Sequence, residues 1–175
     1  MCAAVLTNVA RGCPVRVMMG RVGNQDRVEA VYRSVHSRLW RSLLSYTGDA
    51  ELASDAEAEA FAQVLRRGDT VDDVEAWVWR SAFRIAAGLL AAWPCSTDLG
   101  SASGSTPPTG SVAEFLGLLS ELSPQQRACV ALRYVGEYTS TEIGDLLGTS
   151  AGTVRVQLNR AHAALRHTIT EAERA

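Results

Sequence analysis

The chain has 175 residues, of which 47% are apolar, so it could form one medium domain or two small ones with packed cores. Its formal net charge of −2 excludes a protein that coats nucleic acid through overall positive charge, but it allows a local basic face. There is no run of about 18 apolar residues, so no membrane span is expected. The four cysteines form no C-x-x-C pair and have no histidine at zinc-ligand spacing, so we expect neither a metal nor a cofactor. The same cysteine pattern favours a reduced, cytoplasmic setting.

Two stretches of the chain are poorly suited to a core. The apolar run within residues 1–24 is short and interrupted, and positive charge follows it instead of preceding it, which predicts a disordered leader and not a signal peptide. The segment 94–111, PCSTDLGSASGSTPPTGS, is rich in Ser, Gly, Pro and Thr, which predicts a flexible linker. The chain is therefore expected to contain one domain at 25–93 and another at 112–170.

The first domain is predicted to contain three helices. Apolar residues recur at helical spacing from Val28 and stop before Gly48. Asp49 is suited to cap the second helix, and Asp72 with Glu75 is expected to form a capping box for the third. The helices are expected at about 28–46, 52–65 and 74–92.

The second domain carries repeated signals for helix starts. Ser123 with Gln126 forms a predicted capping box, with Pro124 at the first helical position, and Thr139 with Glu142 repeats the box. Helices are expected at about 112–122, 124–135, 140–147 and 151–168. No segment shows strand-like alternation, so the fold class is predicted to be all-α, with two small helical domains.

The last two predicted helices are joined by Gly148-Thr149-Ser150, which is typical of a helix-turn-helix, whose second helix enters the major groove of DNA. No Asp or Glu lies between Asp145 and Glu171, and a carboxylate there would be repelled by DNA phosphates. A solvated helix face with several arginines is the alternative interpretation. Hydrogen-bond donors on the expected outer face are Ser150, Thr153, Arg155, Gln157, Asn159 and Arg160.

Both blocks resemble the extracytoplasmic-function (group 4) sigma factors of bacterial RNA polymerase. The second block resembles region 4 in the motifs Leu122–Arg127, Leu132–Tyr134, Glu142-Ile143, Leu147-Gly148, Gly152–Val154 and Leu165-Arg166. The first block resembles region 2 in the Thr47–Asp49 turn, in the spacing of Asp55, Glu59 and Phe61, and in Glu75–Trp77. The resemblance implies that domain 25–93 is region 2-like and that domain 112–170 is a region 4-like helix-turn-helix domain.

The resemblance also implies functional residues. In this family region 2 docks on the polymerase core and opens the −10 element, and here the core-docking residues would be Asp55, Glu59 and Phe61. The family captures a flipped −10 base at the loop 68–73 and the helix that follows it. The residues implied there are Thr70, Val71, Asp72, Asp73, Trp79, Arg80 and Arg84.

Region 4 of the family reads the −35 element. The matching base-reading positions here are Arg155, Val156, Asn159 and Arg160: arginine suits a guanine edge, asparagine an adenine, and valine a thymine methyl group. Ser150, Thr153 and Gln157 are expected to contact the DNA backbone.

The resemblance therefore predicts a sigma factor that binds RNA polymerase core and promoter DNA, and it adds an anti-sigma factor as a frequent partner in the family. The third helix departs from the family pattern, because Arg84, Gly88 and Ala91-Ala92 stand where an Asn, an Asp and a basic pair are usual. Two alternatives stay open: a helix-turn-helix regulator that works without polymerase, and a sigma-like protein that binds core but does not melt promoters. No catalytic arrangement of nucleophile, base or paired carboxylates stands out, so no enzyme is expected.

Overall fold

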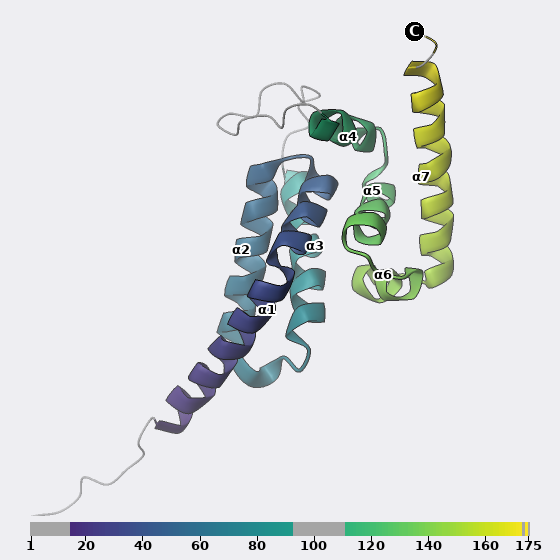
Figure 1. Cartoon of the computed structure of the whole chain (residues 1–175). Coiled ribbons are helices and arrows are strands. Elements are labelled where there is room, and N and C mark those ends of the chain that lie inside the picture. The colour runs from purple at the N-terminus through teal and green to yellow at the C-terminus, as the bar shows by residue number, and fades with distance from the viewer. Residues whose placement is uncertain (1–14, 93–110, 173, 175) are drawn as a thin grey trace, which may run out of the picture.

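The computed structural model describes residues 15–92, 111–172 and Arg174, and the described residues form helices and no strands (Figure 1). The N-terminal half, residues 15–92, contains α1 (Val15–Thr47), α2 (Ala50–Arg67), the 3-10 turn η1 (Gly68–Thr70) and α3 (Val74–Ala92). The C-terminal half, residues 111–172, contains α4 (Ser111–Ser120), α5 (Pro124–Val130), the π-helical segment η2 (Ala131–Val135), α6 (Ser140–Leu147) and α7 (Ala151–Ala172). The all-α prediction is confirmed.

The first helix is longer than the sequence pattern suggested. α1 begins at Val15, inside the segment 1–24 for which a disordered leader was expected. Residues 1–14 lie outside the described residues, as do residues 93–110, which hold nearly all of the predicted linker. None of the described helices combines the length and the hydropathy that a bilayer crossing requires.

Most of the predicted helix caps are present. The Asp49 carboxylate accepts hydrogen bonds from the backbone N–H groups of Glu51 and Leu52, at 2.7 and 2.9 Å. Two of the three predicted capping boxes, those at the starts of α5 and α6, are formed. Such caps satisfy N–H groups that have no partner inside the helix, and each typically stabilises a protein by about 1 kcal/mol.

The predicted cap of α3 is wrong by one residue. Asp73, and not Asp72, caps this helix: its Oδ1 accepts the backbone N–H of Ala76 at 2.9 Å. Asp73 immediately precedes the first helical residue, which places its short side chain against the free N–H groups of the first turn. Glu75 does not close a capping box, because its carboxylate binds the Arg38 guanidinium on α1 at 3.0 Å.

The N-terminal half is a bundle of three helices in which α1, α2 and α3 all contact one another. Its core side chains come from each helix at helical spacing and include Leu39, Leu43, Val64, Val78 and Trp79, all fully buried. Burial of each large apolar side chain stabilises the bundle by roughly 1.5–3 kcal/mol before the loss of conformational entropy is counted.

The C-terminal half packs α5 and α6 against the first turns of α7. Ile143 on α6 and Val154 on α7 are fully buried at the centre of this packing. Between the two helices, Gly148 adopts a left-handed conformation with φ of 69°, which glycine tolerates best. The close approach of the turn to Gly144 leaves no space for a side chain there, because a Cβ would lie 2.7 Å from the Thr149 carbonyl oxygen. This is the predicted helix-turn-helix.

The two halves are packed directly against each other (Figure 1). α1 contacts η2 and α5, and α3 contacts α6, so that the buried side chains of both halves form one continuous cluster. The Arg127 guanidinium on α5 donates a hydrogen bond to the Tyr46 carbonyl oxygen on α1 at 3.3 Å. The relative placement of the two sets of candidate DNA-contacting residues follows from this packing.

Candidate DNA and polymerase interfaces

The first turns of α7 present a buried face and an exposed face. Val154, Leu158 and Ala161 are buried against the rest of the C-terminal half. The side chains at the four predicted base-reading positions are all exposed, and their spacing along the helix places them on one outer face. These residues are Arg155, Val156, Asn159 and Arg160. Val156 is an apolar residue, yet it is 47% exposed to solvent.

The other three predicted −35 residues have partners within the protein. Ser150 Oγ accepts the backbone N–H of Thr153 at 3.0 Å and lies 2.9 Å from Thr153 Oγ1, so this pair caps α7. Gln157 is half-buried, and its amide donates to Gln125 Oε1 on α5 at 3.4 Å. Ser150 and Thr153 remain exposed at the helix N-terminus, whereas Gln157 faces α5 instead of the outer face.

The electrostatic character of the outer face matches the sequence pattern. The guanidinium groups of Arg155 and Arg160 form no ion pair with any residue in the described part of the chain, and no acid lies on α7 before Glu171. Unpaired guanidinium groups at the start of a helix that follows a tight turn are available to phosphates and to guanine edges.

The predicted core-docking residues on α2 differ in exposure. Asp55 is exposed, and Glu59 is half-exposed with its carboxylate bound to Arg66 at 2.7 Å. Hydrogen bonds from Gln63 and then Arg66 lower the pKa of the Glu59 carboxyl. Phe61, in contrast, is only 7% exposed and belongs to the core of the N-terminal half. The Phe61 ring therefore packs in the core beneath α2, and it is not presented to solvent.

A polar cluster beside these residues was not predicted. Glu57 is 6% exposed, and its Oε1 lies 2.9 Å from Nδ1 of His36 on α1. Tyr32 stacks on the His36 ring with centroids 4.7 Å apart, and its own ring meets the edge of Phe61. Burial raises the pKa of the Glu57 carboxyl, and the hydrogen bond from His36 opposes that shift. No local sequence pattern connects His36 with Glu57, because the two residues lie on different helices.

The predicted −10 loop lies at the end of the bundle where α2 turns into α3. Thr70, Asp72 and Asp73 are exposed, while Val71 is buried as part of the core. The Arg27 guanidinium on α1 donates hydrogen bonds to the carbonyl oxygens of Val71 and Asp72, at 3.1 and 2.9 Å. The loop backbone is thus held in place while its polar side chains face solvent.

Trp79 is fully buried, so its ring is not available to stack on a base in this arrangement. It lies between Arg38 of α1 and Tyr138 of the turn that follows η2. Sequence spacing alone could not distinguish a base-stacking tryptophan from a core tryptophan on the same helix.

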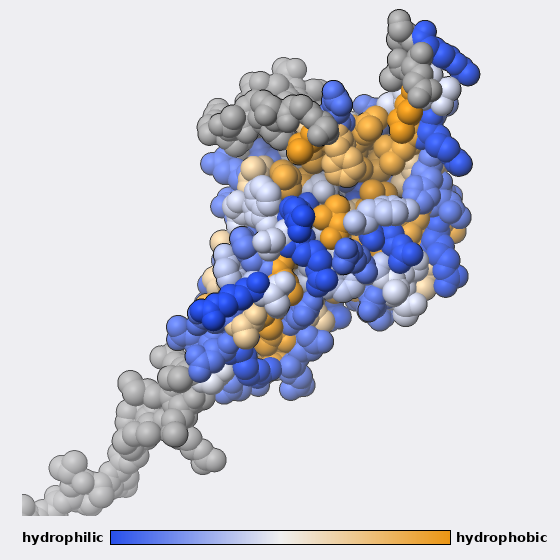
Figure 2. Space-filling model, viewed as in Figure 1, coloured by the Kyte–Doolittle hydropathy of each residue, from blue (hydrophilic) through white to orange (hydrophobic). Residues whose placement is uncertain are grey.

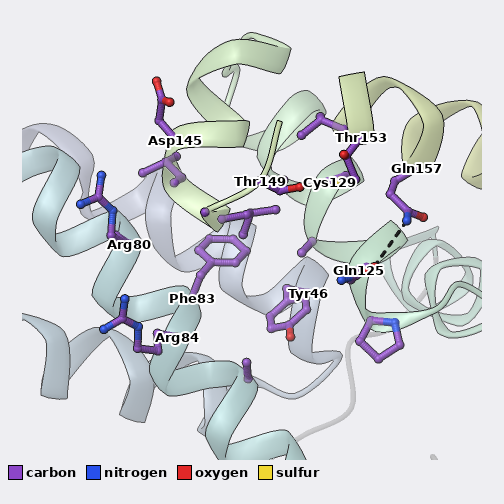
Figure 3. A pocket seen from close by; sticks show the side chains of 17 residues that line it. Tyr46, Arg80, Phe83, Arg84, Gln125, Cys129, Asp145, Thr149, Thr153 and Gln157 are labelled. Atoms are coloured by element: carbon purple, nitrogen blue, oxygen red, sulfur yellow. Dashed lines mark hydrogen bonds between the residues drawn. The ribbon is translucent and has the colours of Figure 1, made fainter. Parts of the chain in front are cut away.

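The remaining two −10 candidates, Arg80 and Arg84, are exposed on α3 at the boundary with the C-terminal half. Both line a pocket of about 610 Å³ that lies between the halves (Figure 3). Thr153 and Gln157 of α7 line the same pocket, and so do Phe83 and Cys129. The structure therefore brings together side chains predicted to contact the −10 element and side chains predicted to contact the −35 element.

Apolar side chains also gather on the surface of the C-terminal half, over α4 and the last turns of α7 (Figure 2). Val112 and Phe115 on α4 and Ile169 on α7 are each more than two-fifths exposed. Exposed apolar patches often mark places where proteins bind one another. In the described residues, no group of three or more histidine, cysteine or acidic side chains could hold a metal ion.

Comparisons with known proteins agree with this geometry. Residues 113–165 match the family described as "Sigma-70, region 4". The ECF RNA polymerase sigma factor SigL of Mycobacterium tuberculosis is 27% identical to this chain, in an alignment that covers 82% of this chain and 89% of the relative.

Solved structures give the same fold at lower sequence identity. CnrH, solved in complex with the cytosolic domain of CnrY, has a TM-score of 0.68 at 18% identity and covers 90% of this chain and 96% of its own. The sigma factor RpoE of Bartonella quintana, solved in complex with the anti-sigma factor NepR, has a TM-score of 0.58 at 15% identity and covers 83% of this chain and 96% of its own.

The fold and the exposed face of α7 define a helical protein with a helix-turn-helix of the DNA-binding type. The region 4 match over residues 113–165 and the similarity to SigL over most of the chain agree with the resemblance seen in the sequence: the chain is similar to extracytoplasmic-function sigma factors and carries a segment that matches sigma-70 region 4.

Proposed function

We propose that the protein is a sigma factor that binds the core of RNA polymerase and directs promoter-specific transcription initiation. The observation that carries the proposal is the outer face of α7, where Arg155, Val156, Asn159 and Arg160 are exposed together on a helix that follows a glycine turn. The region 4 match spans this face, and the relatives that match over most of the chain are named sigma factors.

In this proposal the C-terminal half reads the −35 element. α7 enters the major groove with its N-terminal end first, and the two unpaired arginines bond guanine edges or phosphates. Asn159 is suited to adenine and Val156 to a thymine methyl group, because amides and apolar groups complement those edges. Ser150 and Thr153, at the helix N-terminus, are placed for a backbone phosphate.

The N-terminal half would dock on core and open the −10 element. Asp55 and Glu59 lie on an acidic stretch: residues 49 to 75 contain nine acids and two arginines, which is suited to a basic partner surface. Thr70, Asp72 and Asp73 present polar side chains that could hold an unstacked base. The apolar patch on α4 and α7 adds a second surface for a protein partner. RpoE of Bartonella quintana was solved in complex with an anti-sigma factor, and an anti-sigma factor is the further partner expected for this protein. The proposed site of action is the cytoplasm.

The proposal is tested by transcription in vitro with core polymerase from a bacterium of high GC content. Transcript starts are mapped across fragmented genomic DNA with and without the protein. Discrete starts that share two spaced upstream elements establish a sigma factor and give its promoter sequence. Core that does not bind the protein, in a copurification from the same mixture, refutes polymerase-dependent function and favours a helix-turn-helix regulator.

A sigma-like protein that does not melt promoters is favoured by one specific observation. Gly88, Ala91 and Ala92 present no charged or hydrogen-bonding side chain on the exposed surface of α3, where phosphate contacts would help to hold melted DNA. On a template with an artificial pre-melted bubble, such a protein would start transcription, whereas on the matched duplex it would not. Equal activity on both templates refutes this alternative.

A matched pair of arginines on α7 tests the DNA-reading face itself. Arg155→Ala should weaken binding to the mapped −35 element by about 1–3 kcal/mol if it makes a bidentate base contact. Arg166→Ala is the control, because it removes the same side chain from the same helix three turns further from the helix-turn-helix. Equal losses in the two variants would contradict the assignment of the reading face to the N-terminal turns.

A further inference from the structure

We propose that the pocket of about 610 Å³ between the two halves is a binding site for a small amphipathic carboxylate. The apolar body of the ligand, an acyl chain or a ring, fills the pocket, and its head group pairs with Arg84. The inference goes beyond the proposed function and does not rest on it, because it requires neither polymerase nor promoter DNA.

The walls of the pocket are mostly apolar and come from both halves. Tyr46 and Phe83, each only 5% exposed, contribute aromatic rings from the N-terminal half. Their ring centroids are 5.4 Å apart and their planes are inclined by 35°, so the two rings form one aromatic surface (Figure 3). The apolar lining residues of the C-terminal half are Pro124, Ala128, Cys129, Leu146, Leu147 and Val154.

The pocket is larger than the gaps that close packing usually leaves. Packed protein interiors contain few spaces wider than a water molecule. Pockets that bind small organic molecules typically measure about 300–1,000 Å³ and are lined by apolar and aromatic side chains with a few polar groups. Entry of an apolar group releases the water that contacts such walls, which favours binding. The volume and the lining therefore fit a small molecule with an apolar body.

Two arginines at the α3 edge of the pocket make this edge cationic (Figure 3). Arg80 and Arg84 are exposed, lie one helical turn apart, and form no ion pair with any residue in the described part of the chain. Arg80 also lines an adjoining cleft of about 280 Å³, together with the acids Asp73, Glu75, Glu142 and Asp145. Arg84 does not line that cleft, so its charge is the less offset by neighbouring carboxylates.

The other polar groups of the pocket compete little for this position. Asp145 also lines the pocket, and Figure 3 shows its carboxylate directed away from the two aromatic rings. At the opposite end of the pocket, the Gln157 amide donates to Gln125 Oε1 at 3.4 Å, so these two side chains bind each other (Figure 3). The guanidinium of Arg84 is therefore the group that a ligand can pair with, and its planar fork of donors matches the two oxygens of a carboxylate.

The balance of charge favours a ligand with a single negative charge. Two guanidinium groups and one carboxylate line the pocket, and four carboxylates line the adjoining cleft. A polyphosphate would place further negative charge near these acids, and like charges at this range repel. A neutral apolar molecule would fill the pocket without pairing with Arg84. A monocarboxylate satisfies both the walls and the charge.

The test is a titration of the full chain with octanoate, followed by the methyl NMR signals of Leu146, Leu147 and Val154, which line the pocket. We expect saturable shifts of these signals. Octanoate should bind at least about fivefold more tightly than octan-1-ol, because the alcohol has a chain of the same length but lacks the charge that pairs with the guanidinium. The absence of saturable shifts, or equal affinities for the acid and the alcohol, would overturn the inference.

Two variants test the head-group position and the pocket separately. Arg84→Gln should remove most of the preference for octanoate over octan-1-ol, whereas Arg41→Gln, which removes an exposed guanidinium of α1 outside the pocket, should leave the preference unchanged. Ala87→Phe places a ring in the pocket from an exposed position on α3 and should weaken binding of both ligands at least about tenfold, because the ring takes the space of the apolar body. Ala91→Phe, one turn further along α3 and also exposed, is the control for this ring.

The exposed apolar patch on α4 and α7 is the competing place for an octyl chain. The methyl signals of Val112 and Ile169 report on this patch, because both side chains are more than two-fifths exposed there. Shifts confined to these two residues, or equal octanoate affinities in Ala87→Phe and Ala91→Phe, would refute the pocket. Shifts at the pocket residues that Ala87→Phe abolishes, and that Ala91→Phe retains, support it. The methyl spectrum of each variant without ligand also shows whether the variant is folded.

Discussion

Gly144→Ala should destabilise the helix-turn-helix, although the same substitution usually stabilises a helix. An added Cβ would lie 2.7 Å from the Thr149 carbonyl oxygen and 3.2 Å from the Ala151 backbone nitrogen. Neither atom can move freely, because the Thr149 N–H is hydrogen-bonded to the Gly144 carbonyl at 2.8 Å and Ala151 begins α7. The backbone between α6 and α7 must therefore shift by several tenths of an ångström.

The magnitude follows from two opposing effects. Forcing a methyl group into a close-packed site costs about 1–3 kcal/mol. Replacement of glycine inside a helix contributes about 0.5–1 kcal/mol of stability in return. The free energy of unfolding of Gly144→Ala should therefore be lower than that of the wild type by about 1 kcal/mol, the difference between the centres of these two ranges.

The assay is urea unfolding followed by far-ultraviolet circular dichroism, with Gly117→Ala as the matched control. Gly117 lies inside α4 of the same half, and a Cβ there would meet no atom within 4 Å. Its replacement should raise the free energy of unfolding by about 0.5–1 kcal/mol. Changes of the same sign in the two variants would refute the claim that close approach of the turn is what requires Gly144.

Three further predictions concern caps, pH and salt. Asp73→Ala should lower the free energy of unfolding by about 1 kcal/mol in the same urea assay, because it removes the cap of α3. Asp72→Ala should change the free energy of unfolding by less than about 0.5 kcal/mol, and equal losses in the two variants would contradict the cap assignment. Burial raises the pKa of the Glu57 carboxyl in the folded state above its ordinary value of 4.5, so the contribution of this group to stability is full below pH 4.5 and is lost as pH rises through the folded pKa. Glu57→Gln should remove that loss, and an unchanged pH profile of unfolding in the variant would show that Glu57 is not its source. Arg160→Ala should reduce the slope of log affinity for duplex DNA against log salt concentration by about 1 if Arg160 contacts a phosphate, and an unchanged slope would exclude that contact.

The pH effect expected in the buried cluster on α1 and α2 comes from the Glu57 carboxyl. Protonation of Glu57 removes a buried charge, so the N-terminal half becomes more stable as pH falls from neutral toward the raised pKa of Glu57. Because the cluster lies next to the predicted core-docking surface, core affinity measured across this range provides a readout separate from unfolding.

The surface features that the sequence identified are local ones. Asp49, Ser123 and Thr139 cap helices because each side chain reaches N–H groups only two or three residues along the chain. The Gly148 turn and the exposed face of α7 were predictable for the same reason, because each depends on residues that are close together in the sequence. The exposed face follows from helical periodicity. The cap of α3 shows the limit of this reasoning, because Asp73 forms it and Asp72 was predicted. Either of two adjacent aspartates can cap a helix, and which one does so depends on the exact residue at which the helix starts.

What the sequence determined by itself, therefore, was the all-α class, the helix-turn-helix and the face of α7 that is free of acids, because each depends on residues within one or two helical turns of one another. What only the tertiary structure decided was the burial of Trp79, its contacts with Arg38 and Tyr138, and the pairing of His36 with Glu57. These partners are brought together by helix packing from distant parts of the chain, and no local pattern encodes their contact. The packing of the two halves against each other, which places DNA-contacting candidates from both around one pocket, has the same origin.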